Sequence, residues 1–205
     1  MLLERKTMQG IISAVRRNSL AENAGIKAGE KLCAVNGVSV HDIIELSYLV
    51  ADEQIVLTIE DSECRQRQIV IEKYTDEELG LEFEAAVFDG VTTCYNNCVF
   101  CFVDQMIPGM RESLYVRDDD YSLSFLYGNF ITLTNMKEED FEQIIKTHMS
   151  PLYISVHATR PEVRCQMMNN RFAGELMSKI NRLVEAGISI HTQIVCCPGY
   201  NDGEV

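Results

Sequence analysis

Alternating apolar and polar residues mark the first 84 positions as a set of short strands. Val and Ile alternate with polar residues in segments that predict strands at 10–15, 31–40, 55–61 and 67–74. Helical patterns interrupt the strands at 20–24 and 42–50. Asn36-Gly37 signals a tight turn within the second strand segment. We therefore predict a small, mostly-β domain over residues 1–84.

The pattern changes near residue 85, where strand-like and helix-like segments begin to alternate. Strands are predicted at 84–91, 128–135, 152–159 and 188–199, and helices at 137–148 and 173–187. Alternating units of this size imply a parallel sheet with helices on its outer face. Residues 85–205 are therefore expected to form a second, α/β domain.

The last three predicted strands each have one apolar face and one polar face. The apolar face can pack under helices, but the polar face cannot also be buried there without cost. We expect the polar faces to line the interior of an α/β barrel, whose site lies at the carboxyl ends of its strands. The candidate side chains are those of Thr132, Thr134, Ser155, His157, His191 and Gln193.

Composition narrows the function classes. The chain has 205 residues and is 46% apolar, which is enough for a substantial core. It has no apolar run long enough for a membrane span and no signal-peptide pattern at its start, so we predict a cytoplasmic protein. The net charge of −13 argues against binding to nucleic acid or to an anionic membrane, because both need clustered Lys and Arg.

Eight cysteines in a chain without a secretory signal favour metal binding or catalysis over disulfides. Three of them, Cys94, Cys98 and Cys101, have the spacing C-x3-C-x2-C directly after a predicted strand. A structural zinc site would need a fourth ligand, which could come from Cys165, Cys196 or Cys197. The Cys196-Cys197 pair could also hold an auxiliary cluster or act as redox thiols, although we favour simple packing. An iron–sulfur cluster with three protein ligands would leave one iron open for chemistry.

The run GIISAVRRNSLAENAGIKAGEKLCAVNGVSV at 10–40 resembles a bacterial PDZ domain. The resemblance implies the circularly permuted strand order of bacterial PDZ domains. Leu79, Gly80 and Leu81 of the LGLEF segment would then form the loop whose N–H groups receive a peptide carboxylate, and an edge strand for the peptide would follow. No basic residue adjoins this segment in the sequence, so Gly80 could equally serve only to turn the chain of a packing or docking module.

The cysteine motif resembles that of the radical SAM superfamily, CxxxCxxC with an aromatic residue, here Phe100, before the third cysteine. The segments ISVHATRPEVR and QIVCCPGYNDG look like the third and fourth strand ends of its partial TIM barrel. The whole chain resembles a bacterial family that joins an N-terminal PDZ-like domain to a radical SAM domain. Because only four barrel strands are predicted, we expect residues 85–205 to be the N-terminal part of such a barrel in a longer protein.

The resemblance implies that the three cysteines ligate three irons of a 4Fe-4S cluster, and that S-adenosylmethionine chelates the fourth. An electron from a donor such as flavodoxin or ferredoxin would release a 5′-deoxyadenosyl radical, which takes hydrogen from an unidentified substrate. Phe100 would lie against the adenine. The sequence has TLTN where many members place GGE to hold the methionine amino group, so hydroxyls, an amide oxygen or backbone carbonyls would serve instead. The remaining cofactor or substrate contacts would come from Thr132, Thr134, Asn135, Ser155, His157 and Gln193.

Two alternatives stay open. The protein could be a non-catalytic adaptor that recruits a peptide or protein partner through the PDZ-like module and senses redox state or metal through an iron–sulfur or zinc site. The loop at 104–127, which contains RDDDYS, could be a lid or a substrate contact, but we favour a solvated acidic loop.

Overall fold

The computed structural model describes residues 10–204. Contacts between Cα atoms divide the chain after Gly90 into an N-terminal and a C-terminal unit. This division lies shortly beyond the predicted boundary at residue 84. None of the helices within the described range has both the length and the apolar character that crossing a membrane requires.

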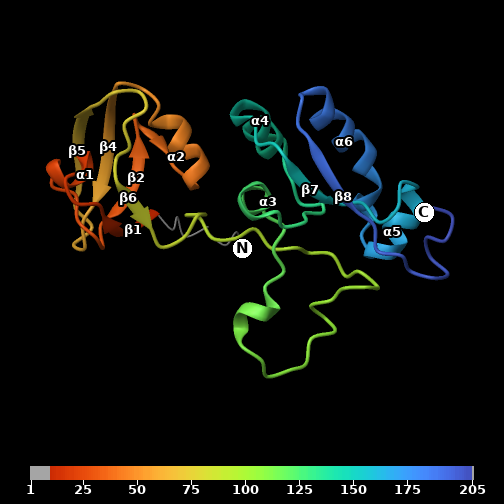
Figure 1. The fold of residues 1–205 in the computed structure, drawn as a ribbon. Helices are drawn as coiled ribbons and strands as arrows, with labels where there is room; N and C mark the ends of the chain where they lie inside the picture. The colour runs from red at the N-terminus through yellow and green to blue at the C-terminus, as the bar shows by residue number, and fades with distance from the viewer. Residues whose placement is uncertain (1–9, 205) are drawn as a thin grey trace. The chain divides into compact units, whose positions relative to one another are not determined.

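The N-terminal unit is built on an antiparallel sheet (Figure 1). Its order is β5-β4-β2-β1-β6, and the short β3 pairs with β2. The strands are β1 (Gly10–Val15), β2 (Lys31–Val35), β3 (Val38–Ser39), β4 (Gln54–Glu60), β5 (Gln66–Glu72) and β6 (Leu81–Phe83). These strands confirm the predicted ones. The predicted turn at Asn36-Gly37 is also confirmed, because both turn residues have the positive φ that this hairpin needs.

Two short helices, α1 (Leu20–Asn23) and α2 (Ile43–Leu49), confirm the two predicted helical segments. Side-chain oxygens begin both of them: Ser19 accepts from the Glu22 N–H at 3.2 Å, and Asp42 accepts from the N–H groups at the start of α2. The apolar faces of the strands and helices meet in one core, whose fully buried members include Ile12, Leu32, Val35, Ile55, Leu57 and Ile59.

The predicted strand at 84–91 is wrong. These residues make only an isolated bridge between Val87 and Asp42. Phe88 is 3% exposed, packs against Phe83 with the ring centroids 4.8 Å apart and the rings tilted, and joins the N-terminal core. The reason is local: β6 ends beside this core, so the apolar side chains that follow it are buried there and not in a new sheet.

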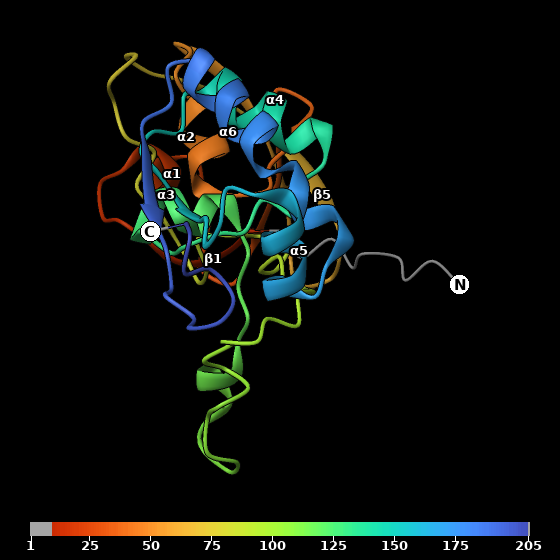
Figure 2. The ribbon, with the colours of Figure 1, turned by 90° about the vertical axis from the view of Figure 1, so that its right-hand side faces the viewer.

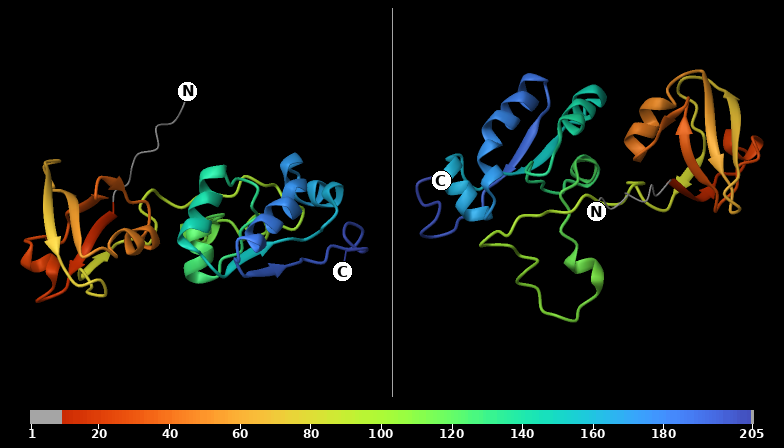
Figure 3. Two further views of the ribbon diagram at one scale, coloured as in Figure 1. Left: turned by 90° about the horizontal axis from the view of Figure 1, so that it is seen from above. Right: turned by 180° about the vertical axis from the view of Figure 1, so that it is seen from behind.

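The C-terminal unit contains two parallel strands and four α-helices within the described range. They are α3 (Tyr121–Tyr127), α4 (Glu138–Thr147), β7 (Leu152–Ser155), α5 (Pro161–Met168), α6 (Leu176–Glu185) and β8 (Ile190–Gln193), with 3-10 turns η1 (Glu112–Tyr115) and η2 (Arg171–Glu175). Helices α4 and α6 lie on the same face of the β7–β8 pair (Figures 2 and 3). The predicted parallel arrangement, with helices on one face, is confirmed for this pair.

The predicted strand at 128–135 shrinks to a single parallel bridge. Ile131 pairs with Ile154, and the Ile131 carbonyl accepts from the Ser155 N–H at 2.8 Å. Gly128 and Leu133 have φ values of 77° and 58°, so only a short extended segment fits between them. The parallel order is therefore the Ile131 segment, β7 and β8, and a barrel stays a prediction.

Two helices were missed by the sequence pattern. Helix α5 begins with Pro161 at its first position and ends at Asn169 in the left-handed conformation. Helix α3 begins after Asp120, whose carboxylate accepts from two backbone N–H groups, and ends at the left-handed Gly128. Both helices are short, so their apolar periodicity is weak and only these end signals mark them.

Candidate functional site

A cavity of about 390 Å³ lies at the carboxyl ends of the parallel segments of the C-terminal unit. Eight of the predicted site residues line it: Cys94, Cys98, Phe100, Cys101, Thr132, Ser155, His157 and Gln193. Side chains that sequence reasoning missed complete the wall, among them Asn96, Arg117, Asp118, Asn129, Phe130 and Met168. The tertiary structure thus brings the cysteine loop and the strand ends to one place.

The cysteine loop is anchored by its backbone at both ends of the motif. The Cys94 N–H donates to the Arg117 carbonyl at 2.7 Å, and the Val99 N–H donates to the Met167 carbonyl at 2.9 Å. All three cysteines line the same cavity. Within residues 10–204, however, no three His, Cys, Asp or Glu side chains converge closely enough to hold a metal ion.

Burial governs the chemistry of these thiols. Desolvation, together with the nearby Cys94 and Cys101, raises the pKa of Cys98 to about 12. The pKa of Cys94 is raised too, chiefly by burial. Without a cation these two thiols stay protonated at neutral pH, and a metal must displace their protons to bind. Three soft sulfur donors on one wall suit an iron–sulfur group, and the loop would have to draw them together around it.

Asn96 connects the cysteine loop to the strand ends. Its side chain is 3% exposed, and its amide nitrogen lies 3.2 Å from the Cys94 sulfur, 3.1 Å from the Thr132 hydroxyl and 2.9 Å from that of Thr134. The Asn170 amide donates to the Asn96 side-chain oxygen at 2.7 Å. An asparagine between two cysteines carries little sequence signal, which is why Asn96 was missed.

Phe100 and His157 form a pair in the cavity wall. Their ring centroids are 4.4 Å apart, and Phe100 also packs against the small core around Met167. Burial, followed by the charge of Arg164, lowers the pKa of His157 to about 4. Its Nδ1 accepts from the Val195 N–H at 3.2 Å, so the neutral ring carries its proton on Nε2. His157 is also one of few non-glycine residues with positive φ, at 62°, a conformation found disproportionately at functional sites.

Three predicted residues do not line the cavity. Thr134 and Asn135 bond to each other, and the Asn135 amide donates to the Thr93 carbonyl at 2.9 Å, so both brace the cysteine loop. His191 stacks on Tyr153 at 4.7 Å, because it lies two residues before the carboxyl end of β8. The alternation of side chains put the right face inward, but the cavity takes only the end of each strand.

The acidic segment, residues 118–120, departs from the solvated loop that we favoured for 104–127, although residues 104–113 are largely exposed. Asp119 is 4% exposed and accepts from the Thr132 N–H and hydroxyl at 2.5 and 2.6 Å, and burial raises its pKa. Asp120 is 4% exposed and begins α3. Asp118 lines the cavity, and its Oδ2 accepts from the Asn129 amide at 2.8 Å. Each aspartate thus has its own structural position.

Asp118 contributes a carboxylate to the cavity wall, and Arg117 contributes a guanidinium. Among the described residues that line the cavity there is no other carboxylate or guanidinium. Arg117 pairs with Asp104 and also donates to the Asn96 carbonyl at 3.5 Å. A wall that contains both a carboxylate and a guanidinium suits a zwitterionic group such as the end of an amino acid.

The Arg164 side chain is buried, with 1% of the residue exposed, and its guanidinium donates four hydrogen bonds to backbone carbonyls. The acceptors are the carbonyls of Thr132, Ser155, Val156 and Ala173, at 2.6 to 2.9 Å. Burial lowers its pKa to about 10, so it stays charged at neutral pH. One side chain therefore ties the ends of the parallel segments together.

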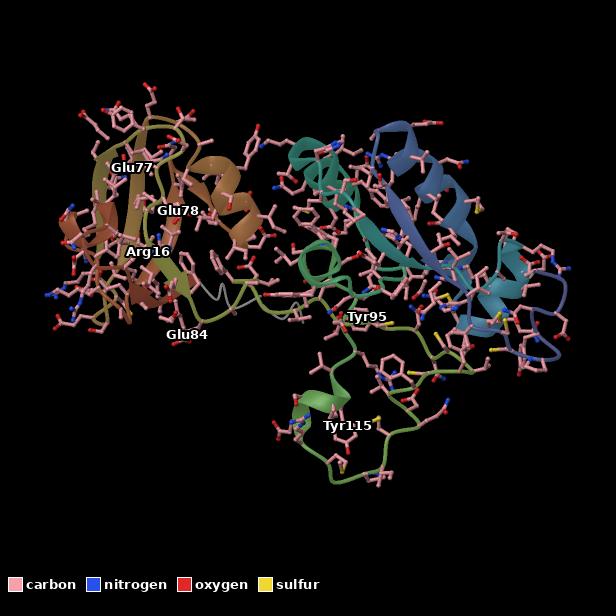
Figure 4. The ribbon with its side chains drawn as sticks, viewed as in Figure 1. Arg16, Glu77, Glu78, Glu84, Tyr95 and Tyr115 are labelled. Atoms are coloured by element: carbon pink, nitrogen blue, oxygen red, sulfur yellow. The ribbon has the colours of Figure 1, made fainter. Side chains whose placement is uncertain are left out.

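The segment at 104–116 extends away from the rest of its unit (Figure 2). Tyr115 lies on it (Figure 4), and its hydroxyl donates to the Ile107 carbonyl at 2.5 Å and accepts from the Met110 N–H at 2.9 Å. These bonds shape the segment internally. The alternative that the loop is a lid or a substrate contact stays a hypothesis.

In the N-terminal unit the predicted peptide loop is held against α1. The Leu79 carbonyl accepts from the Ala21 N–H at 3.0 Å, the Gly80 carbonyl accepts from the Arg16 N–H at 2.9 Å, and Leu81 begins β6. Sequence reasoning found no basic residue next to this loop, but the fold supplies one: Arg16 pairs with Glu78 at 2.6 Å (Figure 4).

Comparison with protein families agrees with both units. Residues 73–205 match the model of the radical SAM-like domain, and residues 11–61 match that of a PDZ domain. No curated protein matches the chain. Because the first match covers more than half of the sequence, the chain belongs to the radical SAM-like domain family, with a PDZ domain preceding that domain.

Proposed function

We propose that the protein is a radical SAM enzyme, in which Cys94, Cys98 and Cys101 hold a 4Fe-4S cluster beside bound S-adenosylmethionine. The observation that supports this most strongly is that the three thiols and Phe100 line one cavity at the carboxyl ends of parallel segments. We further propose that these segments begin a partial α/β barrel. When bound, the cluster and S-adenosylmethionine supply a 5′-deoxyadenosyl radical, made with one electron from a donor such as flavodoxin or ferredoxin, that takes a hydrogen atom from the substrate.

The other wall residues have chemistry that suits S-adenosylmethionine. Asp118 can accept from the methionine ammonium, and Arg117 can donate to its carboxylate. In this proposal the ammonium is bound by the Asp118 carboxylate of the acidic segment. From the sequence we expected that contact in the TLTN stretch. The Phe100 ring offers an apolar face to the adenine, and the Nε2–H of His157 offers a fixed donor. Thr132, Ser155 and Gln193 add hydroxyl and amide groups for the ribose or the substrate.

Anaerobic reconstitution tests the proposal. We expect about four irons and four sulfides per chain, and formation of methionine and 5′-deoxyadenosine after reduction. Cys98→Ala should lose the iron, while Cys64→Ala, an exposed cysteine of the N-terminal unit, should keep it. One tightly bound zinc that survives oxygen would contradict the proposal.

The alternative is a redox or metal-sensing adaptor, and turnover separates the two. If the reduced, reconstituted protein binds S-adenosylmethionine but never forms 5′-deoxyadenosine, the adaptor is the better description.

We also propose that the PDZ domain docks a peptide. Strand β6 ends the sheet order of the described N-terminal unit, so its outer edge offers backbone groups to an added strand. The Leu79-Gly80-Leu81 loop would receive the peptide carboxylate, with Arg16 nearby. Fluorescence anisotropy with random C-terminal peptides should show binding that amidation of the carboxylate abolishes. Arg16→Glu should weaken it and Arg65→Glu, on the distant β4–β5 turn, should not.

A further inference from the structure

The side chain of Asn96 is placed to donate a hydrogen bond to a cysteine sulfur. It lies two residues after Cys94, is 3% exposed, and its amide nitrogen is 3.2 Å from the Cys94 sulfur. The neighbouring Asn97 is exposed and is held through its backbone, whose N–H donates to the Met168 carbonyl at 3.1 Å. Two adjacent asparagines therefore differ sharply in their relation to the cysteines.

The orientation of the Asn96 amide is fixed by its other partners. Its oxygen accepts from the Asn170 amide at 2.7 Å. With the oxygen turned toward this donor, the NH₂ group faces the sulfur and the hydroxyls of Thr132 and Thr134. The Cys94 backbone is also held, because its N–H donates to the Arg117 carbonyl at 2.7 Å. The fold therefore fixes the donor and the backbone that carries the sulfur.

An N–H donor near a cysteine ligand acts on the electron affinity of the cluster that the cysteine holds. Reduction adds negative charge to the cluster and its sulfurs, so a hydrogen bond to sulfur stabilises the reduced state more than the oxidised one. A buried donor does this more strongly than an exposed one, since water cannot replace it.

We propose that Asn96 is a positioning residue that raises the reduction potential of the cluster held by Cys94, by donating its side-chain N–H to that sulfur. This inference rests on the proposed function, because it requires the cluster. A higher reduction potential would make the cluster easier for its electron donor to reduce.

The test compares two matched pairs of variants, Asn96→Ala with Asn97→Ala and Asn96→Asp with Asn97→Asp. Each is reconstituted as the full chain, its iron and sulfide are counted, and its midpoint potential is measured by redox titration followed by electron paramagnetic resonance. For Asn96→Ala we expect the ratio of reduced to oxidised cluster at a given potential to fall about tenfold, which is about 59 mV for one electron. Asn96→Asp should lower the midpoint potential further, because a carboxylate replaces the donor. The variants of the exposed Asn97 should shift the midpoint potential much less.

Equal midpoint potentials in the Asn96 and Asn97 variants, with full iron in both, would overturn the inference while leaving the proposed function standing. If the wild-type protein itself assembles no cluster, both fail together. Should the Asn96 variants lose the cluster, the Asn97→Ala protein, which keeps Asn96, decides: with its asparagine side chains labelled with ¹⁵N, pulsed electron resonance should detect a nitrogen coupled to the reduced cluster. Absence of that coupling overturns the inference.

Discussion

His157 should make the C-terminal unit sensitive to acid. The pKa of its imidazole is lowered from 6.5 to about 4, first by burial and then by the charge of Arg164. Between these two values the unfolded chain binds a proton that the folded protein does not. The free energy of unfolding therefore has its full His157 contribution above pH 6.5, loses it as the pH falls through this window, and changes no further below pH 4.

The size of the effect follows from the two pKa values. Each pH unit of the window is worth about 1.36 kcal/mol, so the whole window corresponds to about 3 kcal/mol. The ring is 3% exposed, so solvent does little to screen it. A loss of this size is a large part of the stability of an ordinary domain.

Two measurements check this prediction. Nuclear magnetic resonance of the ring protons, assigned with the His157→Gln variant, should show a histidine that titrates near pH 4. Urea unfolding of the C-terminal unit, followed by hydrogen exchange in peptides that contain β7, should show His157→Gln gaining about 3 kcal/mol relative to wild type between neutral pH and about pH 4. The control His191→Gln, at a ring that stacks on Tyr153, should show no such gain. A His157 ring that titrates at or above pH 6.5 would refute the reasoning.

Substitutions at three further residues test the packing. Arg164→Met removes the donor to four backbone carbonyls and should cost the C-terminal unit about 3–5 kcal/mol in the free energy of unfolding by urea. Arg164→Lys should recover only part of this loss, because a single ammonium nitrogen replaces the planar guanidinium. Equal stability of the wild type and both variants would contradict this role. Phe88→Ala should destabilise the N-terminal unit by about 3–5 kcal/mol, and a loss of protection confined to the C-terminal unit in hydrogen exchange would show that the residue was assigned to the wrong core. Gly80→Ala should lower the melting temperature of the N-terminal unit, because φ is 77° at this position and the new Cβ would lie 2.4 Å from the Cβ of Ser19. We expect a cost of about 2 kcal/mol or more in the free energy of unfolding. An unchanged melting curve would contradict this prediction.

The elements that the sequence predicted well are those whose signal lies within a few residues. The strands of the N-terminal unit, the Asn36-Gly37 turn and helix α4 all follow from local alternation, turn chemistry or helical period. The C-x3-C-x2-C spacing is local in the same sense. The helix α5 was missed although Pro161 marks its start, because eight residues give little periodicity.

What depended on the tertiary structure is where distant segments meet. Alternation showed that Ser155, His157 and His191 share a polar face, but not that the cavity stops short of His191. Composition described the aspartates of 118–120 as a charged run, whereas the fold buries Asp119 against Thr132.

The sequence by itself determined the donor atoms of the candidate site, because three closely spaced thiols lie in one short stretch of the chain ahead of a βα pattern. Only the tertiary structure decided the surroundings of those thiols: the Asn96 amide beside Cys94, the carboxylate and guanidinium in the wall, and the buried Arg164 beneath the strand ends. The physical reason is that hydrogen bonds and burial depend on contacts between residues far apart in the chain, and no local period encodes such contacts.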